Sequence, residues 1–313
     1  MSGNSTKNTS PLVSVIINCF NGAEYLNLAI DSVFAQTYSN WEIIFWDNCS
    51  TDNSALIAKN YGDKLKYFRA ESKTNLGDAR NLALKKAKGE YISFIDCDDI
   101  WEPSKLQVQI NLLEDNKDLA LCYSGIEEIF LDGSHFRYVN TKYQTGYIFK
   151  ELLMQYDISI LTSMIRSEIL KSTSLSFDIN ITASEEYCLF MQLACKYQIG
   201  VSKAILAKYR VHETSLTSKS LQVLGKERRY TLNKILLNNP GIEQKYKSQF
   251  REAFARADYY DSRWLMTIND RSRAFKLLSK NSFIGINYFL LMVVSLFPAI
   301  LWNKIHKKYR QRV

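Results

Sequence analysis

Short apolar runs alternate with amphipathic segments over the first third of the chain, and this alternation constrains the fold more than any other feature. The runs at residues 13–18, 41–46, 65–69 and 91–95 are rich in β-branched and aromatic residues and are too short for buried helices. Between the first two, residues 24–36 carry apolar side chains on one helical face. Four alternations of strand and helix predict a parallel, right-handed α/β sheet flanked by helices.

Polar residues follow three of these strands at the point where each one ends. Asn18 ends the first strand, Asp47 and Asn48 follow the second, and Asp96 and Asp98 follow the fourth. Ligands of such sheets bind beyond the carboxyl ends of the strands. We therefore expect these side chains to meet in one binding crevice.

The fourth strand runs directly into three acids, Asp96, Asp98 and Asp99. Several carboxylates at one sheet edge are unfavourable unless a cation or hydrogen bonds compensate them. Two acids in D-x-D spacing suit a hard ion such as Mg²⁺ or Mn²⁺, which also keeps waters and phosphate oxygens as ligands. The alternative is an Asp-rich turn with solvated side chains. The convergence of polar residues at the other strand ends favours the metal site.

Beyond residue 102 the sequence predicts a second group of elements. These are a helix at 103–116, a strand at 119–123, a hairpin joining 126–130 to 136–139, helices at 147–154, 167–172 and 184–197, and a strand at 204–210. The expected organisation is a disordered tail at 1–10, an α/β domain at 11–218, a helical subdomain at 219–280 and an apolar helix with a basic tail at 281–313.

Charge and cysteine content exclude several classes of protein. The net charge is +8, but five Lys and Arg residues lie in the last eleven residues, which leaves +3 for the rest of the chain. We therefore expect no nucleic-acid surface on the body of the protein. The six cysteines show no paired framework and no metal-binding spacing, and the polar N-terminus resembles no signal peptide. Both observations predict a cytoplasmic protein with reduced thiols.

Residues 285–302 form an apolar stretch that precedes the basic tail. As a helix of about 27 Å it would be slightly short for a bilayer core, and Asn287 and Pro298 weaken a spanning helix further. We expect a helix docked on, or re-entrant in, the cytoplasmic face of the membrane. Trp302 would lie at the interface and the basic tail would face anionic lipid, so residues 285–313 would contact the membrane. The alternative is a soluble helix packed against the helical subdomain.

Five stretches between residues 11 and 215 together resemble the family 2 glycosyltransferases, which have the GT-A fold. They are VSVIINCFN, AEYLNLAIDSVFAQTYSNWEIIFWDNCSTDNS, NLGDARNLALKKAKGEYISFIDCDDIWEP, SEEYCLFMQLA and YRVHETS. The resemblance implies a Rossmann-like, mostly parallel sheet flanked by helices, here with a helical C-terminal extension. It also implies metal-dependent transfer of a sugar from a nucleotide-diphosphate sugar, with inversion at the anomeric carbon. The acceptor would be a glycan or a lipid-linked saccharide in surface polysaccharide or lipopolysaccharide synthesis.

The same resemblance assigns roles to individual residues. Its metal positions, for Mn²⁺ or Mg²⁺, correspond to Asp98, Asp96 and His212. Its donor-binding positions correspond to Asn18, Phe20, Asp47, Asn48, Asn75, Asp78, Arg80, Asp96 and Cys97. Its acceptor side corresponds to Asp99 and Trp101. Its general base corresponds to Glu186, with Glu185 as a contender.

Two positions depart from the family's common pattern, and several assignments have alternatives. Asn48 replaces an Asp that often accepts from uracil; an amide oxygen can also accept there, so a UDP-sugar stays the expected donor. Glu185 and Glu186 replace Glu-Asp, and acids in a first helical turn also occur simply because they oppose the helix dipole. His212 could be an ordinary exposed histidine after a strand.

Two other functional classes remain open. One is a sugar-nucleotide nucleotidyltransferase, but residues 19–23 lack the glycine-rich, basic phosphate loop of that class. The other is a non-catalytic nucleotide-sugar-binding module, which only turnover distinguishes from an enzyme.

Overall fold

The computed structural model describes residues 10–212, 220–298 and 301–302. The chain divides into two compact units. The first, here called the sheet unit, comprises Met1–Ile148, Asp157–Asn180 and Leu193–His212. The second, here called the helical unit, comprises Phe149–Tyr156, Ile181–Gln192 and Glu213–Val313.

One nine-stranded sheet forms the centre of the sheet unit, in the order β3-β2-β1-β4-β8-β6-β9-β5 with β7 paired to β6. Its strands are β1 Val13–Cys19, β2 Trp41–Asp47, β3 Leu65–Arg69, β4 Tyr91–Phe94, β5 Ile100–Trp101, β6 Leu119–Ile129, β7 His135–Val139, β8 Met164–Arg166 and β9 Gln198–Arg210. The predicted parallel order of the first four strands is confirmed. Beyond them β6 and β9 are parallel, while β8, β5 and β7 pair antiparallel, so the whole sheet is mixed.

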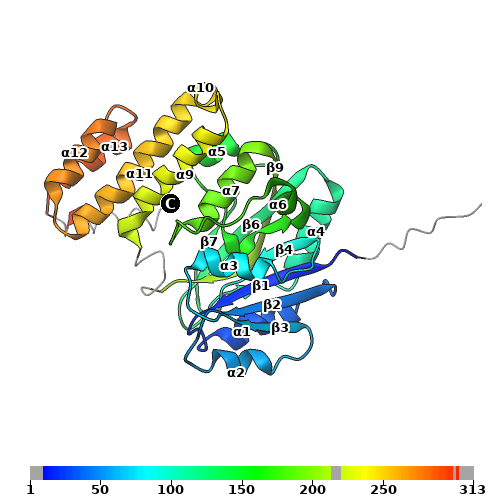
Figure 1. Ribbon diagram of the computed structural model, residues 1–313. Helices are drawn as coiled ribbons and strands as arrows, with labels where there is room; N and C mark the ends of the chain where they lie inside the picture. The colour runs from blue at the N-terminus through cyan, green and yellow to red at the C-terminus, as the bar shows by residue number, and fades with distance from the viewer. Residues whose placement is uncertain (1–9, 213–219, 299–300, 303–313) are drawn as a thin grey trace, which may run out of the picture. The chain divides into compact units, whose positions relative to one another are not determined.

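The helices of the sheet unit cover both faces of the parallel strands. They are α1 Leu26–Phe34, α2 Ser54–Lys59, α3 Leu76–Leu84, α4 Lys105–Asp115, the short 3₁₀ helix Ile160–Thr162, and α6 Ser167–Thr173. Figure 1 shows α1 and α2 on one face of β1–β3 and α3 on the other. Because both faces are covered, β2 is buried throughout and β1 is buried except at Asn18.

Strand register brings the ends of β1, β2 and β4 to one edge of the sheet. Val13 pairs with Trp41 on one side and with Tyr91 on the other. The same register places Cys19 opposite Asp47. The N–H of Ile95 donates to Ile16, so the turn after β4 begins beside the end of β1. The predicted convergence of the strand ends is therefore present.

The helical unit contains more of the chain than the sequence predicted. Its helices are α5 Phe149–Met154, the first part of α7 Glu185–Lys196, α9 Leu221–Asn238, α10 Ile242–Lys245, α11 Lys247–Thr267, α12 Arg271–Asn281 and α13 Ile286–Ser295. The Phe149 ring lies 5.6 Å from that of Tyr246 and 6.1 Å from that of Phe250, which ties α5 to α11. An expected boundary at residue 219 misses α5 and α7 because their partners come from distant sequence.

The apolar stretch at 285–302 is not one continuous helix. α13 ends at Ser295, and Pro298 follows before Leu301 and Trp302 become helical again. In the described part of the chain no helix is long and apolar enough to cross a membrane. Trp302 is buried with Leu265, Met266, Ala274 and Leu278, so the prediction that it lies at a membrane interface is wrong. Most of the basic tail, residues 303–313, lies outside the described residues.

Candidate active site

The turn after β4 presents two carboxylates and buries a third. The side chains of Asp96 and Asp98 are 40% and 35% exposed, whereas Asp99 is 1% exposed. The N–H of Asp99 donates to the carbonyl of Asp96 at 3.3 Å, which closes the turn. Asp96 and Asp98 are therefore the acids of this turn that a ligand can reach.

His212, two residues after β9, lies against the same turn. Its Nε2 is 2.9 Å from Oδ2 of Asp98. The structure thus joins two residues that are 114 positions apart, and it disfavours the view of His212 as an unconnected surface histidine. A carboxylate and an imidazole side by side are both metal-ligand types.

Two buried arginines supply positive charge near the acids: Arg210 lies beside Asp98 and Asp99, and Arg80 lies beside Asp96. The guanidinium of Arg80, a buried residue, lies 3.4 Å from Oδ1 of Asp96. Loss of hydration raises the pKa of Asp96, and the neighbouring charge of Asp98 adds to this effect. Burial likewise raises the pKa of Asp99, with further contributions from Asp98 and Asp96. An added cation would relieve this repulsion.

The residues of this turn fit an open divalent-metal site. Among the described residues no cluster of three or more His, Cys, Asp and Glu side chains forms a preformed metal cage. Mg²⁺ and Mn²⁺ do not require one, because they bind through one or two carboxylates and take the remaining ligands from water and substrate phosphates. The exposed carboxylates of Asp96 and Asp98 are ligands of this kind.

The end of β2 is different, because protein partners already occupy its polar groups. Asp47 is fully buried and accepts from Tyr67 at 2.5 Å, Arg69 at 2.6 Å and the N–H of Ser50 at 2.7 Å. Burial alone would raise the pKa of Asp47, but these hydrogen bonds and the Arg69 charge hold it below its ordinary value. The resemblance placed Asp47 against the donor, whereas the structure assigns its carboxylate to the scaffold.

Asn48 is similarly engaged. Its Nδ2 donates to the carbonyl of Thr74 at 2.9 Å, and its Oδ1 accepts from the N–H of Thr74 at 3.1 Å. This two-way pairing fixes the loop before α3. In this structure the Asn48 amide faces Thr74 and holds the loop before α3.

Other predicted donor residues surround the end of β1. The Nδ2 of Asn18 is buried and, within the described part of the chain, has no hydrogen-bond acceptor. Phe20 is 44% exposed, and the Lys73 ammonium lies 3.4 Å from its ring centre. Cys97 donates to the carbonyl of Asn18 at 3.4 Å, so it acts as a packing group between the two strands. Of these residues Phe20 is exposed and Asn18 is half-buried.

The N-terminus of α3 holds two more predicted residues. Asn75 caps the helix by accepting from the N–H of Asp78 at 2.8 Å, and it donates to Ile179 at 2.7 Å. Asp78 is half-buried in the first turn. Asn75 thus holds the segment that leads to Arg80.

Trp101 does not line a binding surface. It is buried in the core, and its indole N–H donates to the carbonyl of Leu161 at 3.0 Å. The prediction that it contacts the acceptor is therefore wrong. Asp99, predicted for the same role, is internal as well: its Oδ1 accepts from the N–H of Arg210 at 2.9 Å.

Glu185 and Glu186 open α7 in the helical unit. Glu185 is buried, whereas Glu186 is half-buried and retains access to solvent. The loop before them is held by Glu227, whose carboxylate accepts from the N–H groups of Thr182 and Ala183. No sequence motif indicates Glu227, because only the fold brings α9 to this loop.

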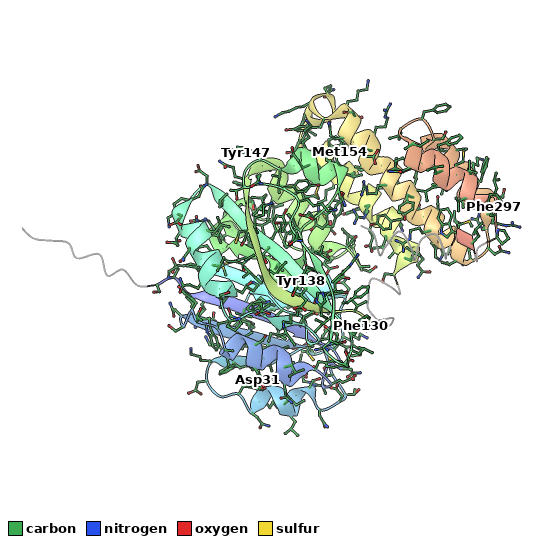
Figure 2. All side chains as sticks on the ribbon, turned by 180° about the vertical axis from the view of Figure 1, so that it is seen from behind. Asp31, Phe130, Tyr138, Tyr147, Met154 and Phe297 are labelled. Carbon is green, nitrogen blue, oxygen red and sulfur yellow. The ribbon has the colours of Figure 1, made fainter. Side chains whose placement is uncertain are left out.

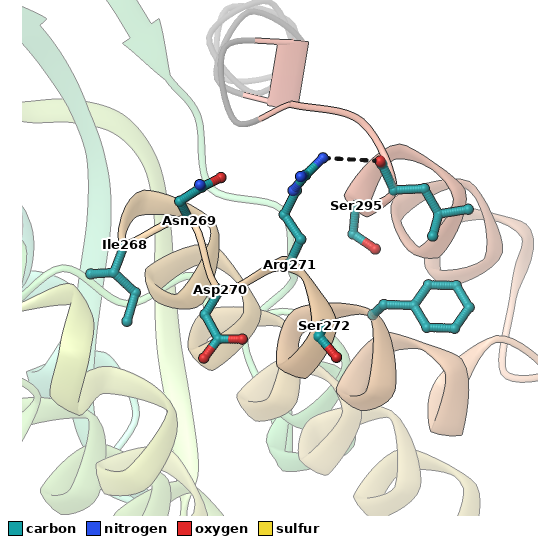
Figure 3. Close-up of a pocket in the computed structure, with 8 residues that line it drawn as sticks. Ile268, Asn269, Asp270, Arg271, Ser272 and Ser295 are labelled. Atoms are coloured by element: carbon teal, nitrogen blue, oxygen red, sulfur yellow. Dashed lines mark hydrogen bonds between the residues drawn. The ribbon is translucent and has the colours of Figure 1, made fainter.

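A pocket of about 630 Å³ opens elsewhere in the helical unit. It is lined by Ile268, Asn269, Asp270, Arg271, Ser272, Phe275, Ser295 and Leu296 (Figure 3). The Arg271 guanidinium reaches the carbonyl of Leu296 at 3.5 Å, which joins the start of α12 to the end of α13. None of the residues predicted for the active site is among those that line this pocket.

The chain belongs to the family described as glycosyl transferase family 2, whose sequence profile matches residues 14–171. It is a glycosyltransferase, and the ends of β1, β2 and β4 lie within the matched region, whereas the end of β9 and His212 lie beyond it. An uncharacterized glycosyltransferase of Rickettsia typhi, RT0329, is 37% identical over 69% of this chain and 69% of its own length. A second relative, from Escherichia coli, is 30% identical over 69% of this chain and 83% of its own length; it is named UDP-Glc:alpha-D-GlcNAc-diphosphoundecaprenol beta-1,3-glucosyltransferase WfgD.

Solved structures share the fold at low sequence identity. A fragment of S. aureus TarS in complex with UDP-GlcNAc superposes with a TM-score of 0.68 at 19% identity, covering 96% of this chain and 91% of that one. The mannosyltransferase PcManGT of Pyrobaculum calidifontis, in complex with GDP-Man and Mn²⁺, gives a TM-score of 0.61 at 14% identity, covering 97% and 86%. These likenesses confirm the expected GT-A fold with C-terminal helices.

Proposed function

We propose that this glycosyltransferase uses Mn²⁺ or Mg²⁺ to transfer a sugar, with inversion, from a nucleotide-diphosphate sugar to a hydroxyl of a glycan or lipid-linked saccharide. The observation that carries the proposal is the pairing of Asp98 with His212 beside Asp96, at the sheet edge where β1 and β4 end. A divalent ion held there would neutralise the donor's diphosphate and stabilise the leaving nucleotide.

The protein's own groups supply the remaining chemistry. Asp96 and Asp98 would hold the ion from the β4 turn, and His212 would hold it from the end of β9. Glu186, the more exposed acid of α7, would accept the proton of the acceptor hydroxyl. The acceptor oxygen then bonds to the anomeric carbon as the bond from that carbon to the phosphate oxygen breaks, and the nucleotide diphosphate leaves with the electron pair.

For the donor we propose a UDP-sugar. The named donors of the E. coli relative and of the TarS complex are UDP-sugars, although that of PcManGT is GDP-Man. Because the Asn48 amide pairs with Thr74, base recognition would depend on the loop that this pair shapes and on Asn18. Calorimetry with Mn²⁺ should show UDP binding; tight GDP binding without UDP binding would overturn the donor assignment.

For the acceptor side we propose that the helical unit docks on an anionic membrane surface at the cytoplasmic face. α13 carries an outward apolar face formed by Ile286, Phe289, Leu290 and, just beyond its end, Phe297, which Figure 2 labels. Exposed Lys276 and Lys280 lie on the neighbouring α12, and five more basic residues follow in the C-terminal sequence. Apolar and basic groups together suit an anionic bilayer interface, where a lipid-linked acceptor such as that named for the E. coli relative would be found.

Vesicle sedimentation tests the membrane proposal. Full-length protein should sediment with vesicles of phosphatidylcholine and phosphatidylglycerol, and the double variant Phe289→Glu, Leu290→Glu should bind at least about 10-fold more weakly. Leu237→Glu is the matched control, because Leu237 is an exposed leucine of the same unit on α9. Equal binding of the double variant and the control would overturn the proposal.

A turnover assay tests the reaction itself. Purified protein should release UDP from a UDP-sugar with Mn²⁺ in the presence of a saccharide acceptor, and EDTA should stop the release. Formation of a nucleotide sugar from a nucleoside triphosphate and a sugar 1-phosphate would favour the nucleotidyltransferase alternative. Donor binding without any turnover across nucleotides and acceptors would favour a non-catalytic module.

A further inference from the structure

Arg210, the last residue of β9, contacts the turn after β4 that carries Asp96, Asp98 and Asp99. It is 2% exposed, and its Nε donates to the carbonyl of Asp98 at 3.0 Å. Its main-chain N–H donates to Oδ1 of Asp99 at 2.9 Å. One residue therefore fixes both the carbonyl of the accessible acid and the side chain of the buried one.

The same guanidinium also holds the tip of the β6–β7 hairpin. Its Nη1 donates to the carbonyls of Phe130 at 3.2 Å and Leu131 at 2.8 Å. The side chains of Phe130 and Leu131 are exposed, as Figure 2 shows for Phe130. The turn that carries Asp98 and an exposed hairpin tip are thus joined through a single buried side chain.

Tyr25, which precedes α1, fixes the orientation of this guanidinium. The ring centre of Tyr25 lies 4.2 Å from the Arg210 carbon Cζ, within the range of a cation–π contact. The side-chain hydrogen bonds of Arg210 within the described residues all go to main-chain carbonyls, so its charge stays available to the field around Asp98 and Asp99. A group fixed by β9, α1 and the hairpin cannot shift without moving the turn.

We propose that Arg210 is a positioning residue that sets the β4 turn for metal and donor binding and couples it to the hairpin tip. The proposal rests on the proposed function, since it assigns Arg210 to the site that binds the metal and the nucleotide sugar. Lysine cannot replace it, because an ammonium cannot reach acceptors on the turn and the hairpin in the fixed fork of a guanidinium.

Arg166 provides a matched control within the same unit. It is also a buried arginine that donates to main-chain carbonyls, including Leu119 at 2.9 Å, and its Cζ lies 5.2 Å from the ring centre of Tyr91. Its partners lie at the opposite, amino ends of β4 and β6, away from the acidic turn. If buried arginines matter here only for stability, Arg166 and Arg210 should behave alike.

The experiment compares Arg210→Lys, Arg166→Lys and Tyr25→Leu with the wild type. We measure Mn²⁺ affinity in the presence of UDP by calorimetry, kcat and KM for the UDP-sugar, and Tm. Arg210→Lys should weaken Mn²⁺ binding and lower kcat/KM by about 10²-fold, the scale for a misplaced catalytic group. Arg166→Lys should lower Tm while Mn²⁺ affinity and kcat/KM stay at wild-type values. Tyr25→Leu, a change at a half-buried position, should repeat the Arg210→Lys effect at smaller size.

The outcomes separate the two proposals. Equal kinetics and equal Mn²⁺ affinity in Arg210→Lys and Arg166→Lys, beside an active wild type, would overturn the positioning role alone. If Arg210→Lys fails to fold, Tyr25→Leu decides, and wild-type values in that variant would also overturn it. A wild type that binds neither Mn²⁺ nor UDP would remove the proposed function and, with it, the role of Arg210.

Discussion

The ends of β2 and β4 look equivalent in the sequence, since an apolar strand meets acids in both, yet the structure uses them differently. At the end of β2, Asp47 is buried and saturated by Tyr67, Arg69 and Ser50. At the end of β4, Asp96 and Asp98 stay accessible, and the close neighbour of Asp98 is a histidine. An aspartate thus stabilises the fold at the end of β2, whereas aspartates at the end of β4 remain accessible to a ligand.

The hydrogen-bond and ion-pair partners of an acid, more than its place at a strand end, decide whether it stabilises the fold or can bind a ligand. The strand register places Arg69 of β3 directly opposite Asp47, so the protein itself supplies the cation that pairs with this carboxylate. β4 lies between β1 and β8, and the cations beside its turn come from other elements: Arg80 lies 3.4 Å from Asp96, and Arg210 donates to the carbonyl of Asp98. Asp96 and Asp98 nevertheless keep exposed carboxylate oxygens that an external cation could bind.

The largest expected effect comes from removing the accessible acid. Asp98→Ala should abolish Mn²⁺-dependent sugar transfer while the fold stays intact, because its carboxylate lies at the surface of a strand end. Sugar transfer with Mn²⁺ titration measures the loss, and circular dichroism provides the control. Full activity in this variant would contradict the claim that the end of β4, unlike the end of β2, provides a metal ligand.

The contrast between an accessible and a buried acid recurs at the start of α7. Glu186→Gln should keep donor binding and lose about 10²–10⁴-fold in kcat, the range for a general base. Glu185→Gln should change kcat less, because Glu185 is buried. Single-turnover kinetics on both variants measures this, and a larger loss in Glu185→Gln would exchange the two roles.

Asp47→Asn should act on stability before it acts on catalysis. The introduced amide N–H₂ would face the donors Tyr67 and Arg69, at a cost of about 1–3 kcal/mol in unfolding free energy. Mn²⁺ affinity should change by less than about 10-fold, a coupling below about 1.4 kcal/mol. Urea denaturation and calorimetry measure the two quantities, and a metal-binding defect without loss of stability would contradict the scaffold role.

A smaller effect concerns Lys105, a buried lysine of α4 that contacts β4. Lys105 is fully buried and donates to Ser93 of β4 at 2.9 Å and to Gln109 at 2.6 Å, and burial lowers its pKa to about 7. Since the unfolded chain still binds this proton up to about pH 10.4, stability should rise as the pH increases from about 7 toward 10. Below pH 7 both states are protonated and the penalty is constant.

Lys105→Met should remove this component of the pH dependence. Tm measured from pH 6 to pH 10 should rise less steeply in the variant than in the wild type. Parallel Tm curves for the two proteins would show that Lys105 stays charged in the folded state.

Much of this arrangement follows from the sequence, for physical reasons. Apolar runs of strand length fixed β1–β4, and their parallel order placed Asn18, Asp47 and Asp98 at one edge. Whether an acid at this edge can bind a ligand depends on the side chain that the neighbouring strand places opposite it. The register of the two strands decides which side chain that is. Arg210 and Glu227 act across long sequence separations, and Trp302 is buried by α11 and α12 despite its apolar, interface-like surroundings in the sequence.

The most direct test of the central claim is Mn²⁺ binding in the presence of UDP, measured by calorimetry on the wild type, Asp98→Asn and Asp47→Asn under one set of conditions. Asp98→Asn removes charge from the accessible strand end, and Asp47→Asn removes it from the saturated one. The account predicts that Asp98→Asn loses Mn²⁺ binding while Asp47→Asn retains it at lower stability. Mn²⁺ binding that survives in Asp98→Asn and disappears in folded Asp47→Asn would contradict it.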